Sequence, residues 1–207
     1  GDAMATWYEA RICLNNPQAL TPIGARPTLA SCAMGEVCAH TLLEHGEAAT
    51  RAVVANVCDD SLERVVEANT LLSGIGFESG GLALAHPMAL AFTQIDRIHH
   101  NYLHGEMVAM GTLIQLVMEA SKDADKIARF FARVGLPVHM DQLSLSPKAT
   151  DALDTIIEFA LKNKNAHYMP MPVTAASLRE AMLNANDLGL KISAELGDDA
   201  YRRVQGL

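Results

Sequence analysis

Two histidines and one aspartate are the residues of this sequence best suited to chemistry. His86 and His104 lie 18 positions apart in the stretch 73–106, which holds four of the chain's eight histidines. On one straight helix they would be about 27 Å apart, too far to share an ion. The polar segment 93–103 favours a turn, after which two helices would return side by side with both imidazoles facing one point. Together with Asp2 they would form a set of two imidazoles and one carboxylate, which suits Zn²⁺ or Fe²⁺.

The residues alone leave a plainer alternative open. Asp2 lies 84 positions before His86, and no local pattern joins the two. Both histidines could equally be ordinary hydrogen-bonded residues of a helical protein. The other six histidines indicate no better site, since they are expected in the turn, near a helix end or in loops: His99, His100, His40, His45, His139 and His167.

The glycines around position 77 are not a nucleotide-binding motif. Gly74, Gly76, Gly80 and Gly81 follow no strand, and a dinucleotide fingerprint needs a strand before it and a βαβ unit around it. Close helix packing or a tight turn is the expected role of these glycines.

Composition bounds the class of protein. Half of the 207 residues are hydrophobic, aromatic residues make up only 5%, and the formal net charge is -8. An acidic chain of this kind is not expected to bind nucleic acid or an anionic membrane. No apolar run reaches 18 residues and no basic-then-apolar leader is present, so we expect neither a membrane span nor a signal peptide, and a cytoplasmic location. The four cysteines have no C-x-x-C spacing and are expected to be reduced and mostly buried.

Hydrophobic periodicity predicts helices throughout and no strand of any length. The expected helices cover approximately residues 2–14, 28–45 with a further segment to 56, 59–74, a segment holding His86, 106–120, 123–134, 147–162 and 175–196. Gly46 is expected to bend or end the second helix, and Gly74 to end the one before the glycine-rich stretch. The predicted fold is a single all-α domain, residues 1–207, with about eight helices.

Four segments of the sequence resemble the glycerol dehydrogenases, which are part of the metal-dependent (iron-containing) alcohol dehydrogenase group. These segments are Gly1–Ala10 (GDAMATWYEA), Leu62–Thr70 (LERVVEANT), Gly74–Leu82 (GIGFESGGL) and His104–Glu106 (HGE). The similarity extends over nearly the whole chain.

The resemblance implies the function of one half of a two-domain enzyme. That enzyme oxidises glycerol to dihydroxyacetone, with an N-terminal α/β domain that binds NAD and a C-terminal helical domain that holds the metal. Only the second is matched here. The resemblance implies that Asp2, His86 and His104 are the ligands of a zinc ion, with iron as the alternative, and that Phe77 lines the substrate pocket. It also implies a homo-oligomer for the full-length enzyme.

One departure from the family pattern concerns the substrate. Small residues, a second histidine and Asn-Gly usually follow the first ligand histidine, whereas this chain continues with Pro87–Ala91 (PMALA). A relative acting on another small alcohol or hydroxy compound, or a helical metal-binding or assembly module without activity, therefore remain alternatives. We expect the isolated chain to bind metal more weakly than a complete enzyme and to be inactive with NAD⁺, since it lacks a nucleotide-binding half.

Overall fold

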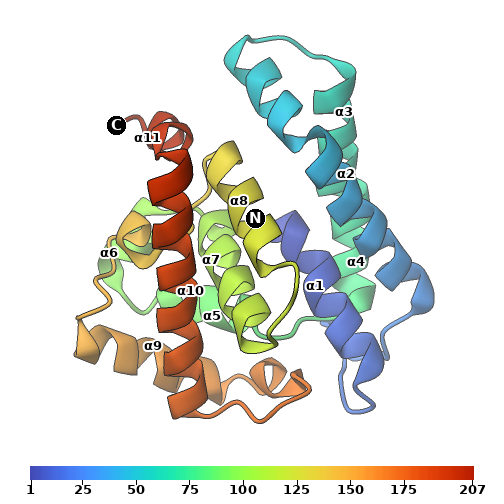
Figure 1. Ribbon diagram of the computed structural model, residues 1–207. Coiled ribbons are helices and arrows are strands. Elements are labelled where there is room, and N and C mark those ends of the chain that lie inside the picture. Colours follow the sequence, from blue (N-terminus) through green and yellow to red (C-terminus); the bar gives the residue numbers. More distant parts are fainter. The chain divides into compact units, whose positions relative to one another are not determined.

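The computed structural model describes residues 1–207, which form helices and no β-strand (Figure 1). The all-α prediction is therefore confirmed. The α-helices are α1 Asp2–Asn15, α2 Leu29–Val54, α3 Asp60–Glu67, α4 Ser73–Gly80, α5 Ala85–Phe92, α6 Asp96–Asn101, α7 His104–Met118, α8 Ala124–Val134, α9 Thr150–Lys162, α10 Ala175–Leu196 and α11 Asp199–Gln205. A π-helical turn, Ala68–Leu72, joins α3 to α4, and short 3-10 helices occupy Met140–Leu143 and Lys164–Tyr168.

The chain divides into two compact units, which we describe separately. The first contains Asp2–Leu82, and the second contains Ala83–Leu207 together with Gly1. None of the helices has the length and apolar character needed to cross a membrane.

In the first unit, α2 packs against α1, α3 and α4. Glycines allow this close packing, because a Cβ atom on Gly76 would approach Thr6 Cγ2 to 2.6 Å and one on Gly80 would approach Ala10 Cβ to 2.8 Å. The expected packing role of the glycine-rich stretch is thus confirmed for these two. Gly81 has a φ of 94° and follows the last residue of α4, so it supplies the turn.

The helix end predicted at Gly74 is wrong, and Gly46, predicted to bend or end the second helix, does not end it. Gly46 is buried inside α2, which continues past it to Val54. Gly74 does not end a helix, because the chain continues through the π-helical turn into α4. In that turn the amide of Ser73 donates to the carbonyl of Ala68, five residues earlier. The wider turn brings Ala68 and then Ser73, Gly76 and Gly80 to the buried side.

In the second unit, α7 is the central element and packs against α5, α8 and α10. Every residue of α7 from Glu106 to Leu116 is buried, as its nearly uniform apolar character predicts. Helix α10 has the predicted bounds, since Thr174 accepts a hydrogen bond from the amide of Ser177 at its start and Gly197 follows its last residue. The tail after Gly197 is helical as α11, which the sequence analysis missed, and the polar connection between His86 and His104 contains α6.

The cysteines are all free thiols, as expected. Cys13, Cys32 and Cys38 are buried, and Cys58 is exposed. Burial raises the pKa of Cys38 to about 11 and also raises the pKa of Cys13 and Cys32.

Candidate metal centre

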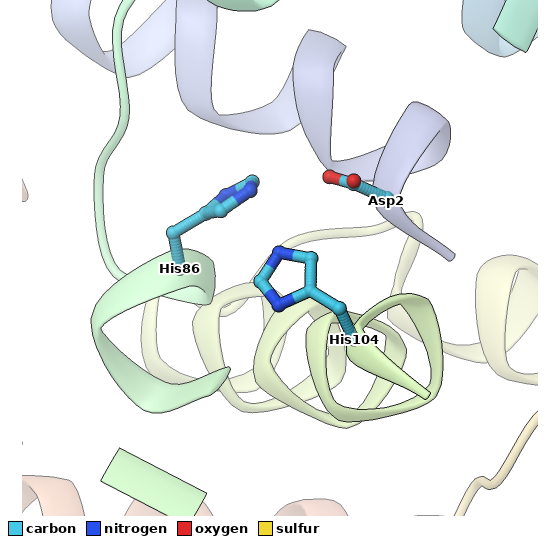
Figure 2. Close-up of side chains that lie close together, drawn as sticks. All are labelled: Asp2, His86 and His104. Atoms are coloured by element: carbon cyan, nitrogen blue, oxygen red, sulfur yellow. The ribbon is translucent and has the colours of Figure 1, made fainter. Parts of the chain in front are cut away.

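His86 and His104 come together at the beginnings of two adjacent helices. His86 is the second residue of α5 and is 5% exposed, whereas His104 is the first residue of α7 and is exposed. Their ring centroids are 5.6 Å apart and the ring planes are tilted by 49°. Figure 2 shows the two imidazoles directed into the same space. The turn predicted between the two histidines therefore does return one helix alongside the other.

A side chain of α7 holds the start of α5, next to His86. Gln115 is fully buried, and its Oε1 accepts hydrogen bonds from the amides of Leu84 (3.0 Å) and Ala85 (3.1 Å). These amides belong to the helix N-terminus, where no intrahelical acceptor exists. On the same face of α7, Gly111 lies so near the carbonyl of Ala85 that a Cβ atom would collide with it. The two helices therefore approach backbone to backbone beside the candidate ligand.

The start of α7, which carries His104, is fixed by Glu106. Its Oε2 accepts a hydrogen bond from the amide of Leu103 at 2.7 Å, and its Oε1 accepts one from Nε2 of Gln205. Glu106 is only 6% exposed. A carboxylate at this position also interacts favourably with the positive end of the helix dipole. Since His104 itself is exposed, its direction depends on this well-defined first turn.

Asp2 completes a group of three potential ligands. Gly1, which belongs to the same compact unit as the histidines, contacts the first turn of α7: a Cβ atom on Gly1 would collide with the carbonyl of Gly105. One ligand atom from each of Asp2, His86 and His104 lies within 4.8 Å of the others (Figure 2). Two imidazoles and one carboxylate are a donor set that suits a zinc or a ferrous ion.

The other residues singled out from the sequence lie elsewhere in the chain. Phe77 is on α4 and is half-buried, and a role in substrate binding stays a prediction. His99 and His100 are exposed, although they are on α6 rather than in a loop. The His100 Nδ1 is 2.8 Å from the carbonyl oxygen of Asp96. Neither histidine is part of the three-ligand group.

Three further histidines have ordinary structural surroundings. His40 is exposed on α2. Nδ1 of His45 is 3.5 Å from the hydroxyl of Ser61, and Nε2 of His167 is 2.9 Å from the carbonyl oxygen of Leu161.

His139 is different, because it is 7% exposed and its Nδ1 has no hydrogen-bond partner. Burial lowers the pKa of His139, against a smaller opposite effect of Asp198 and Asp141.

Sequence reasoning missed the residues that support the two histidines. Gln115 and Gln205 are 29 and 101 positions after His86 and His104, so no local pattern connects them. Glu106 did carry a signal, since an acidic residue in the first turn of a helix is a common helix-start feature.

The chain is similar to known dehydrogenases in both sequence and fold. No family model matches the chain. Among curated proteins, glycerol dehydrogenase of Escherichia coli O6:H1 is 42% identical over 198 residues, 94% of this chain and 53% of its own length. Glycolaldehyde reductase of Halobacterium salinarum is 38% identical over 92% of this chain and 52% of its own length. The crystal structure of glycerol dehydrogenase from Schizosaccharomyces pombe has a TM-score of 0.86 at 30% identity, covering 95% of this chain and 51% of that one.

The chain is thus homologous to the glycerol dehydrogenases over nearly all of its length. It spans about half the length of the curated relatives it matches. The resemblance noted in the sequence is confirmed.

Proposed function

We propose that this chain is the metal-binding half of an NAD-dependent dehydrogenase that oxidises glycerol, with Asp2, His86 and His104 as the ligands of a zinc ion. The observation that carries this proposal is the grouping of these ligand atoms within 4.8 Å in a chain homologous to glycerol dehydrogenases. Iron remains the alternative metal, because two imidazoles and a carboxylate also suit Fe²⁺.

The chain's own residues would bind the metal ion and fix its position. His86 presents an imidazole whose place is fixed by burial and by the capped start of α5. His104 presents a second imidazole from the exposed end of α7, and Asp2 adds one negative charge. When bound, a divalent ion of this kind supplies Lewis acidity that lowers the pKa of a substrate hydroxyl. The hydride acceptor would be NAD⁺, held by a nucleotide-binding half like that expected in the relatives.

Glycerol is the first candidate substrate, and another small alcohol or hydroxy compound is the second. Homologues named glycerol dehydrogenase favour the first, and the relative named glycolaldehyde reductase favours the second. The segment after His86 also favours the second, since Pro87 and Met88 are buried apolar residues where the family usually has small or polar ones. Phe77 is proposed to line the substrate pocket.

Metal titration tests the ligand assignment on the chain as it exists. The 207-residue chain should bind about one equivalent of Zn²⁺ by calorimetry. His86→Ala and His104→Ala should abolish this binding, whereas His99→Ala, which removes an exposed histidine of α6, should not. Unchanged zinc binding in both ligand variants would overturn the assignment.

Activity is tested in a fusion. An NAD-binding half from a glycerol dehydrogenase, joined before Gly1, should produce NADH from glycerol, and His86→Ala or His104→Ala in the fusion should abolish it. The unfused chain should give no NADH, because hydride transfer needs the nicotinamide within about 3.5 Å of the reacting carbon. NADH formation by the purified unfused chain would contradict that part of the proposal. Zinc binding without turnover in the fusion, for glycerol and for other small alcohols, would favour a non-enzymatic module.

A further inference from the structure

The last helix of the chain contacts the segment that carries His104. Gln205, in the last turn of α11, donates from Nε2 to Oε1 of the buried Glu106. The other oxygen of Glu106 accepts from the amide of Leu103, the residue directly before His104. One hydrogen-bonded path therefore runs from Gln205 through Glu106 to the backbone that sets the direction of His104.

A second set of contacts holds α11 near the residues before His104. The hydroxyl of Tyr102 is 2.7 Å from that of Ser144. The hydroxyl of Tyr201 in α11 donates to the carbonyl of Gln142. Burial, together with a hydrogen bond to Tyr102, raises the pKa of Tyr201. At the start of α11, Nε2 of Gln142 donates to the carboxylate of Asp198 at 3.0 Å.

The order of the first turn of α7, which carries His104, depends on Glu106 and on the residue that holds Glu106. Leu103 cannot cap α7, since it has no side-chain acceptor, so Glu106 is the group that orders the start of this helix. Glu106 is in turn held by a residue about 100 positions later in the chain. We propose that Gln205 of α11 is a positioning residue for His104. Its hydrogen bond to Glu106 would order the first turn of α7 and so orient this ligand for metal binding.

The inference rests on the proposed metal site, and it predicts the size of an effect. Groups that orient the ligands of a metal typically contribute about 10- to 100-fold to metal affinity. Gln205 acts through Glu106 and not directly on His104, so we expect its loss to weaken zinc binding about tenfold, at the lower end of that range.

The experiment compares three variants of the full chain. Gln205→Ala removes the donor, Gln205→Lys keeps a donor that can reach the carboxylate, and Arg203→Ala is a matched control at an exposed position of the same helix. Zinc affinity is measured by calorimetry, hydrogen exchange of the Leu103 amide by NMR, and folding by thermal melting. We expect weaker zinc binding and faster Leu103 exchange in Gln205→Ala, near-normal values in Gln205→Lys, and no change in Arg203→Ala.

The results distinguish a positioning role of Gln205 from no role, from general destabilisation of the chain and from the absence of a metal site. Equal zinc affinity in Gln205→Ala and the unaltered chain would overturn the role of Gln205 while leaving the proposed function intact. Weaker zinc binding in Arg203→Ala as well, with lower melting temperatures in both, would show only general destabilisation and would also overturn the role. No zinc binding by the unaltered chain would refute the metal site, and the inference with it.

Discussion

Replacing Gln115 by Met tests how strongly the start of α5 depends on one side chain. Met has nearly the same shape as Gln but no comparable acceptor, so the amides of Leu84 and Ala85 would lose the oxygen they share. All three residues are completely buried, so water cannot easily replace that oxygen.

The magnitude follows from these two amides. An unsatisfied buried donor costs about 1–3 kcal/mol, so two donors give a loss of about 2–6 kcal/mol in the free energy of unfolding. Whole domains are stable by only about 5–15 kcal/mol, so the loss is a large fraction of the total. For a chain of this size it corresponds to a fall in melting temperature of roughly 5–20 °C.

Urea unfolding followed by circular dichroism measures the loss directly. The matched control is Gln18→Met, because Gln18 is exposed in the loop after α1 and its substitution should change stability by less than about 0.5 kcal/mol. A loss below about 1 kcal/mol in Gln115→Met would refute the argument, since it would mean that the two amides find other partners at little cost.

Three other properties can be tested in the same preparations. Gly74→Ala should stabilise the chain by about 0.5–1 kcal/mol, because a Cβ atom there meets nothing within 4 Å. Gly111→Ala should destabilise the chain, because it forces α7 away from the carbonyl of Ala85. Thermal melting should show a higher melting temperature for the first variant and a lower one for the second. Burial lowers the pKa of His139, so the unfolded chain binds the proton more readily than the folded chain. The free energy of unfolding should therefore be constant with respect to this group above about pH 6.5 and fall as the pH drops below it. His139→Met should reduce this pH dependence in urea titrations, and an unaltered dependence would contradict the argument. A thiol reagent at pH 8 should modify Cys58 first, while Cys38, with a pKa of about 11, reacts only on unfolding; equal rates in the native chain would be the contrary result.

Much of the fold could be predicted because the relevant signals are local. The bounds of α10 follow from Thr174 before the helix and Gly197 after it, and both ends are as predicted. Neither Gly46 nor Gly74 ends a helix, because a glycine inside a helix is tolerated when packing compensates or when it costs little. Gly46 is buried in the middle of α2, while Gly74 is exposed in α4. Helix propensity alone does not include the burial of Gly46 or the exposure of Gly74.

The sequence contains signals for the candidate ligands but not for the residues that support them. His86 and His104 are linked by a polar turn that the sequence displays, whereas Asp2 was grouped with them by its residue type, without a local pattern that joins it to the histidines, and the family resemblance then strengthened the grouping. Gln115 and Gln205 show no such signal, since each acts on a backbone group or a carboxylate that only the tertiary fold brings near. Polar side chains of this kind can be recognised only once the positions of the helices are known.

The π-helical turn between α3 and α4 bears on how relatives of this chain would align with it. The buried positions Ala68, Ser73, Gly76 and Gly80 are separated by five, three and four residues, and only the first step exceeds a normal helical spacing. Such a turn is equivalent to one inserted residue in a regular helix. Deleting a single residue such as Thr70, which is exposed, would turn five into four and return the helix to an ordinary α-helical phase with the same buried residues. Homologues with a one-residue gap in 69–71 should therefore keep Gly76 and Gly80 facing Thr6 and Ala10, whereas a gap elsewhere in this helix would rotate that face away.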